Sequence, residues 1–157
     1  MPDHKPPRLT GDERETLLAL LDYQRRSLVR KVAGVDDEVA RRSPVGTGTS
    51  LLWLVKHLAR AESLWILRRF AGGEGELPDD AVMPEDTVAG AVESYRRTWE
   101  AVDAVVADAG LDQPCRDTGD EAWVNLRWVL AHLLEETARH AGHADILREM
   151  ADGETGR

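Results

Sequence analysis

Three histidines and two glutamates lie within twelve residues near the end of this chain, in the segment "HLLEETARHAGH" at positions 132–143. His132, Glu136 and His140 are spaced four residues apart, so on a helix they share one face. Imidazole nitrogens and carboxylate oxygens bind divalent metals, and a pair such as Glu136 and His140 can chelate one ion from a single helix. A closed hydrogen-bond network would also satisfy these side chains. The segment therefore predicts either a metal site or a buried polar network.

The residues around this segment indicate which way the polar stripe faces. At about 100° per residue, Val129 and Leu147 mark the centre of one helix face. Close to that centre lie apolar Leu126, Leu133, Ala144 and Met150, and polar His132, Glu136, His140 and His143. The opposite side carries Arg127, Ala131, Glu135, Asp145 and Glu149. We therefore predict that the polar stripe runs down the middle of the buried face, where an unpaired carboxylate would cost several kcal/mol.

A third ligand is available elsewhere in the chain. His57, in "LLWLVKHLARAE", lies on the flank of a predicted apolar helix face made of Leu51, Leu54, Leu58, Ala61 and Trp65. In a bundle the two helices can be neighbours, and His57 would then complete a metal-binding set with Glu136 and His140. Three protein ligands leave at least one coordination position open, which is typical of a catalytic metal.

Two further histidines are candidates for a catalytic role. His132, one turn before Glu136, is interpreted as a fourth ligand or, more readily, as a hydrogen-bond partner of the carboxylate. His143, one turn beyond His140, is interpreted as a donor either to a substrate or to a backbone carbonyl.

The elements that must position these residues are helical. Apolar residues recur at helical spacing in four segments, at about residues 10–32, 50–70, 86–109 and 125–151, and no sustained strand pattern is present. Thr10 with Glu13 is typical of a capping box, Thr49 or Ser50 would cap the second helix, and Gly153 would end the fourth. The connector before residue 50 suggests one short helical turn. We predict an all-α four-helix bundle over residues 10–153, preceded by a flexible arm at residues 1–9, with long connecting loops after the second and third helices that allow a crossover.

Composition narrows the classes of function. The chain has 157 residues, a net charge of −9 and one cysteine, Cys115. An acidic chain is a poor match for nucleic acid or an anionic membrane, which both require a basic face. No apolar run approaches the roughly 20 residues of a membrane span, and the first residues lack the apolar core of a signal peptide. With a single cysteine, these features lead us to expect a cytoplasmic protein.

The segments "TSLLWLVKHLARAE" and "HLLEETARHAGHADILRE" resemble the DinB-like superfamily, which includes the mycothiol-dependent maleylpyruvate isomerases, and the resemblance covers nearly the whole chain. It implies a four-helix bundle, frequently a homodimer, in which His57, Glu136 and His140 bind a divalent metal. Glu136 stands where many members have histidine, and the resulting His/Glu/His set resembles that of the isomerase branch. The segment "HAGH" replaces the more frequent "HRGQ". The isomerases carry an additional domain for which this chain is too short, so we do not expect that activity.

The resemblance also implies that zinc activates a low-molecular-weight thiol such as mycothiol. We therefore expect a metal-dependent thiol transferase acting on a small-molecule substrate. Zinc is the expected metal, although the same ligands suit nickel, iron or manganese. One alternative is a metal-dependent hydrolase with Glu135 or His143 as the base, although Glu135 points outward on the predicted helix. The other is a non-catalytic bundle, metal-binding or structural, that acts through protein association.

Overall fold

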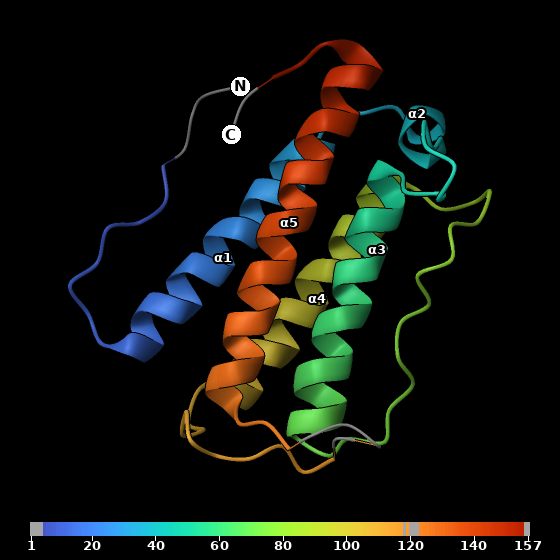
Figure 1. The fold of residues 1–157 in the computed structure, drawn as a ribbon. Coiled ribbons are helices and arrows are strands. Elements are labelled where there is room, and N and C mark those ends of the chain that lie inside the picture. The colour runs from blue at the N-terminus through green and yellow to red at the C-terminus, as the bar shows by residue number, and fades with distance from the viewer. Residues whose placement is uncertain (1–4, 118, 120–122, 156–157) are drawn as a thin grey trace.

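The computed structural model describes residues 5–117, 119 and 123–155, and their regular structure is helical (Figure 1). The first four residues of the predicted N-terminal arm lie outside the described residues. The elements are α1 (Glu13–Val32), the short α2 (Asp37–Arg41), α3 (Leu51–Glu62), its π-helical continuation η1 (Ser63–Phe70), α4 (Val88–Val106) and α5 (Leu126–Asp152). Within the described residues the β-pairing found is one isolated bridge, between Pro114 and Asn125. The prediction of an all-α bundle is confirmed.

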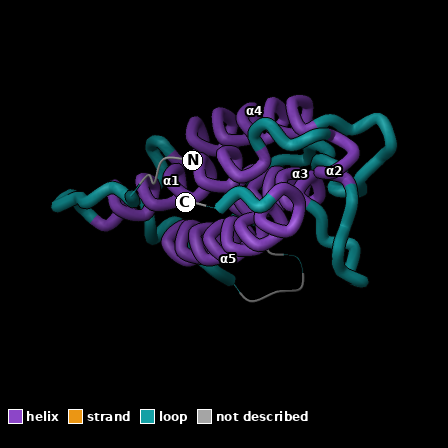
Figure 2. Tube along the Cα trace, turned by 90° about the horizontal axis from the view of Figure 1, so that it is seen from above, coloured by secondary structure: helices purple, strands orange, loops and turns teal. Residues whose placement is uncertain are grey.

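The four long helices, with α3 and η1 counted as one, pack into a bundle whose chain makes one crossover connection. In Figure 1, α1 and α5 run upward, whereas α3 with η1 and also α4 run downward. The two downward helices are neighbours, so residues 71–87 must return along the length of the bundle to begin α4 beside the start of α3. Seen from above, α4 and α5 lie at opposite edges, with α1 and α3 between them (Figure 2). The crossover therefore follows the second long helix, and α3 contacts α5 directly.

Capping residues begin the helices close to the predicted positions. Ser50 accepts a hydrogen bond from the Trp53 amide, and Asn125 accepts one from the Trp128 amide. The predicted capping box of Thr10 and Glu13 is wrong by two residues, because Asp12 is the N-cap of α1 and shares a capping box with Glu15. Both Thr10 with Glu13 and Asp12 with Glu15 have the three-residue spacing of a capping box, and aspartate is the better N-cap residue. Gly153 ends α5 in the left-handed conformation, with φ of 77°.

The buried face of α5 differs from the predicted one. Its buried residues include Leu130, Thr137 and Ala141 in addition to the expected leucines. Thr137 and Ala141 have small side chains, which permit the close packing of α5 against α1, and Leu130 belongs to the same buried cluster as Leu21 of α1. The true buried face is therefore rotated toward α1. The prediction that the whole polar stripe runs down its middle is wrong. His140 is buried as predicted, but Glu136 and His132 are only partly buried on the flank beside α3 and η1, and His143 and Met150 are exposed.

A buried ion pair that the sequence did not reveal ties α1, α3 and α4 together. The guanidinium of Arg25 donates from Nε to Glu62 Oε1 over 3.0 Å and from Nη1 to Asp103 over 2.9 Å. The Tyr95 hydroxyl donates to the same Glu62 oxygen over 2.8 Å. Burial alone would lower the pKa of Arg25, but the charge of Glu62 and these hydrogen bonds outweigh it and raise the pKa. The network holds the end of α3 in place, about one and a half helical turns beyond the candidate ligand His57.

Most of the other buried side chains are apolar, and Lys31 and Arg148 are charged exceptions. One group of buried side chains surrounds Leu28, Leu52 and Leu58, and a second surrounds Leu21, Ile66 and Leu130. Of the predicted face of the second helix, Leu51, Leu54 and Leu58 are buried, whereas Ala61 and Trp65 are only partly so. None of the described helices is long and apolar enough to cross a membrane.

Candidate metal centre

Helices α3 and α5 bring the three predicted ligands together. One ligand atom from each of His57, Glu136 and His140 lies within 4.8 Å of the other two. Glu136 Oε1 is 3.4 Å from His57 Nε2 and 3.0 Å from His140 Nε2. In a tetrahedral site with bonds of about 2.1 Å, neighbouring ligand atoms are about 3.4 Å apart. The cluster therefore has dimensions compatible with a divalent-metal site.

The protonation states of the cluster also suit a cation. Burial is the largest influence on the pKa of His140 and lowers it, so the imidazole is held neutral. Burial alone would raise the pKa of Glu136, but the electrostatic interaction with the His140 ring, the hydrogen bonds from His57 and His140, and the nearby Arg139 outweigh it and lower the pKa. A neutral imidazole and an ionised carboxylate are the forms that bind metals, so little proton release is needed at these two groups.

The second nitrogen of each histidine ring has its own partner. His57 Nδ1 lies 3.3 Å from Asp80 Oδ2, which the crossover segment supplies. His140 Nδ1 lies 3.2 Å from His143 Nδ1, so one of these rings donates to the other. A metal-ligating histidine commonly donates its other N–H to a carboxylate or other acceptor, which fixes the tautomer and ring orientation. Asp80 and His143 are placed to do this for His57 and His140.

Trp53 forms one wall of the cluster. Its ring stacks on His57, with centroids 4.5 Å apart, and meets His140 edge-on at 6.0 Å. It lies one turn before His57 on α3, and that spacing brings the two rings together. The ligand side chains remain partly exposed, at 25% for His57, 17% for Glu136 and 11% for His140. The cluster is therefore shielded on one side and accessible to a small molecule on another.

Not every predicted residue belongs to the cluster. His132 stacks on Trp128, with centroids 4.9 Å apart, and meets Trp65 edge-on at 5.0 Å. The contacts described for it are with these aromatic rings rather than with the Glu136 carboxylate. Glu135 points outward, as expected, and pairs with Arg139 at 2.8 Å.

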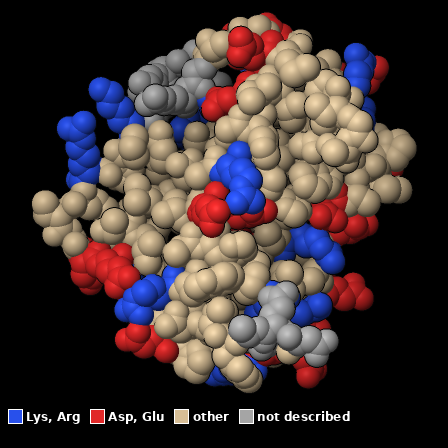
Figure 3. All heavy atoms as spheres, in the orientation of Figure 1, with Lys and Arg blue, Asp and Glu red and all other residues tan. Residues whose placement is uncertain are grey.

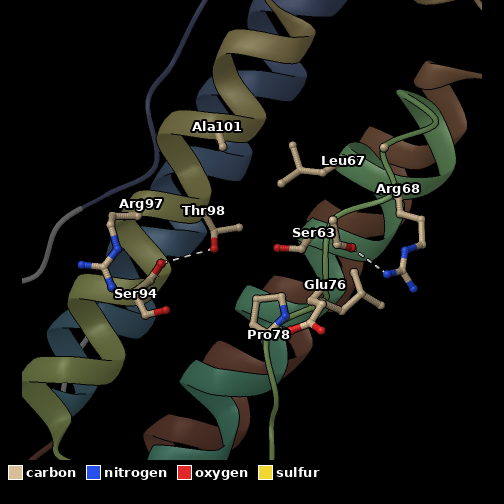
Figure 4. Close-up of a pocket in the computed structure, with 12 residues that line it drawn as sticks. Ser63, Leu67, Arg68, Glu76, Pro78, Ser94, Arg97, Thr98 and Ala101 are labelled. Carbon is tan, nitrogen blue, oxygen red and sulfur yellow. Dashed lines mark hydrogen bonds between the residues drawn. The ribbon is translucent and has the colours of Figure 1, made fainter.

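A separate cavity of about 310 Å³ lies between α4, η1 and the start of the crossover (Figure 4). Ser63, Leu67 and Thr98 point into it, and Arg68 lies at its edge, where it donates to the Gly75 carbonyl over 2.7 Å. None of the candidate ligands lines this cavity. It therefore adds no group to the centre formed by His57, Glu136 and His140.

Sequence reasoning missed Asp80, Trp53 and the pairing of His143 with His140. Trp53 precedes His57 by four residues, and His143 follows His140 by three, so helical spacing alone could have suggested both contacts. Asp80 lies in an irregular segment, where no periodicity relates it to His57.

Comparison with known proteins places the chain in a family and supports the fold. Residues 16–153 match the protein family described as Mycothiol-S-transferase. The chain belongs to this family. A conserved protein from Enterococcus faecalis, known from a crystal structure, is similar in fold, with a TM-score of 0.64 and 18% sequence identity over 92% of this chain and 100% of that chain. At this identity the likeness shows the fold alone. No curated protein matches the sequence.

Proposed function

We propose that this protein is a divalent-metal-dependent transferase that uses the thiol of mycothiol as its nucleophile. Its family and the geometry of one cluster support the proposal. His57, Glu136 and His140 converge from two helices and leave an accessible side. Three protein ligands with an open position are typical of catalytic rather than structural metals.

His57, Glu136 and His140 would hold the ion. When bound, a divalent cation supplies a positive charge that lowers the pKa of a coordinating thiol, and the thiolate is the reactive form. The chain's own residues prepare the position. Asp80 and His143 orient the two imidazoles, and Trp53 limits the access of water to the His57 ring.

Zinc is the metal we propose, because imidazole and carboxylate ligands at tetrahedral spacing suit it, although affinity order alone does not select a metal in the cell. We further propose a homodimer in the cytoplasm, as the single cysteine and the family resemblance led us to expect. The hydrolase alternative with Glu135 as the base has less support, because Glu135 is engaged by Arg139 and faces away from the cluster. His143, which contacts His140, is the remaining candidate base for that alternative.

The observation that carries the proposal is the convergence of three ligands on an accessible position, and cobalt substitution tests it. Titrating the cobalt protein with mycothiol should produce a near-ultraviolet charge-transfer band between sulfur and metal. The band should disappear in His140→Ala. It should persist in His132→Ala, a matched control that removes a histidine from the same helix but not from the cluster.

Protein shown beforehand to carry cobalt, yet giving no band at millimolar thiol, would reject thiol activation. If acetate still binds at that cobalt, the hydrolase reading gains support. If neither ligand binds, the ion is structural and the protein acts as a non-catalytic bundle.

A further inference from the structure

An apolar cavity opens beside the candidate metal centre. It has a volume of about 360 Å³ and lies between the connector that precedes α3 and the last turns of α5. Val45, Ile146, Leu147 and Met150 form its apolar walls, and His143 lies at one edge with two threonines. Val45 is 45% exposed, Ile146 59% and Met150 61%. Large apolar side chains gathered at an accessible cavity are typical of a ligand site.

The cavity is connected to the ligand cluster through one side chain. His143 lines the cavity, and its Nδ1 is 3.2 Å from Nδ1 of the candidate ligand His140. A molecule in the cavity would therefore be separated from the ligand cluster by the His143 imidazole. A reacting group at the cluster and an apolar body in the cavity could belong to the same molecule.

The lining contains no lysine, arginine, aspartate or glutamate. The surface to the right of the upper end of α5 is correspondingly mostly uncharged (Figure 3). A charged ligand would lose its hydration here without gaining a partner. The cavity therefore selects for an uncharged, apolar group.

We propose that this cavity binds the apolar body of the second substrate, an uncharged electrophile that accepts the thiol sulfur. This inference rests on the proposed transferase function and specifies its acceptor. Mycothiol joins a cysteine to two hydroxyl-rich rings, so it has no extended apolar part that could gain from these walls. The apolar cavity therefore suits the reaction partner of the thiol.

The reaction class follows from this assignment. The thiol sulfur forms a bond to an electrophilic carbon of the acceptor, and the bond from that carbon to its leaving group breaks. The electron pair of that bond departs with the leaving group, and the thiol proton is released to solvent. For a chloroacetamide the products are a thioether and hydrogen chloride, with no oxidant or reductant required.

A homologous series of acceptors tests the cavity. N-alkyl chloroacetamides, from methyl to hexyl, share one reacting carbon and differ only in the length of the apolar tail. If the tail enters the cavity, kcat/KM with mycothiol should rise about fourfold for each methylene that becomes buried. Unreactive N-alkyl acetamides should bind in the same order by calorimetry, which measures the cavity without any chemistry.

Two variants of the whole protein locate the effect. Ile146→Asn places a polar group in the cavity wall and should flatten the dependence on tail length in both measurements. Met83→Asn makes the same kind of change at a residue that is 46% exposed on the crossover, outside the cavity, and should leave the dependence intact. Both sites are exposed, so neither substitution should prevent folding.

The outcomes separate this inference from the proposed function. Turnover of every acceptor at a rate independent of tail length would overturn the cavity assignment and leave the transferase standing. Length-dependent acetamide binding that Ile146→Asn abolishes, without turnover of any chloroacetamide, would support the apolar ligand site and reject the transferase. A change of oligomeric state in Ile146→Asn, measured by sedimentation velocity, would overturn the assignment and make this face a subunit interface.

Discussion

The contact between His57 and Asp80 provides a test of the metal centre that leaves all three candidate ligands in place. The structure places Asp80 Oδ2 at 3.3 Å from His57 Nδ1. With a metal at Nε2, the Nδ1–H group would donate to this carboxylate, which fixes the tautomer and makes the ring a better ligand. Asp80→Ala removes the acceptor, so the ring must bind the metal without a defined orientation. We expect the metal affinity to fall.

The magnitude follows from the geometry of this contact. A hydrogen bond to a charged group contributes about 1.5–3 kcal/mol. The His57–Asp80 contact is long, and the Asp80 side chain is 30% exposed, so the lower end of that range applies. A loss of about 1.4 kcal/mol in metal-binding free energy corresponds to a tenfold larger dissociation constant. Asp80→Asn keeps a neutral acceptor and should fall between the parent and Asp80→Ala.

Competition with a chromophoric chelator at fixed pH measures the affinity directly. Asp79→Ala is the matched control, because it removes a neighbouring carboxylate that accepts a hydrogen bond from the Ala81 amide and has no described contact with His57. Equal losses of metal affinity in Asp79→Ala and Asp80→Ala would mean that the affinity depends only on the local charge or the loop conformation. An unchanged affinity in Asp80→Ala would refute the positioning role of the carboxylate.

Three further predictions concern stability. Chelation of metal-loaded protein should lower the melting temperature, because an ion present at 100 times its dissociation constant stabilises the fold by about 2.7 kcal/mol. His57→Ala should melt at the same temperature as the chelated parent, and a chelator that leaves the melting temperature unchanged would show that metal binding and folding are uncoupled. Glu62→Ala should reduce the free energy of unfolding, measured by urea denaturation, by about 3 kcal/mol, because it leaves the buried Arg25 with only Asp103 as a described carboxylate partner. A loss below about 1 kcal/mol would contradict a stabilising role for the Arg25–Glu62 ion pair. Burial alone would raise the pKa of Asp86, but hydrogen bonds from Lys56 and the Met83 amide outweigh it and lower the pKa. Asp86 should therefore stabilise the fold above its unfolded pKa of about 3.9 and lose that contribution as the pH falls through the lower folded pKa. The difference in free energy of unfolding between the parent and Asp86→Asn should disappear in acid, and a difference that stays constant with pH would refute this role of Asp86.

The sequence predicted the helices and the ligand set because both depend on local spacing. Ser50, Asn125 and Gly153 mark helix ends through capping, which is encoded within a few residues. Glu136 and His140 must be neighbours on any helix, and His57 was the remaining histidine within the predicted helices. The all-α fold and the convergence of these three residues were therefore predictable from one sequence.

Other features depend on packing between elements and were not predictable in this way. The rotation of α5 toward α1 depends on Thr137 and Ala141, whose small side chains give a weak apolar signal yet permit close approach. Glu62 resembles any surface glutamate until Arg25 and Tyr95 are brought to it from α1 and α4. The π-helical turn of η1 after Glu62 shifts the buried face, so Ile66 is buried while the predicted Trp65 is only partly buried.

The contrast between the two glutamates on this scaffold indicates where chemistry can occur. Glu62 is fully buried, and both carboxylate oxygens are engaged by Arg25, with a further hydrogen bond from Tyr95, so the site is closed to a ligand. Glu136 lies on a flank, and its Oε1 is shared by the His57 and His140 imidazoles, of which His57 is the more exposed to solvent. A cation at that point would replace two hydrogen bonds by stronger interactions without breaking the core. The bundle thus encloses the Arg25–Glu62 network and leaves the cluster around Glu136 open at its surface, where the proposed metal and substrate would have access.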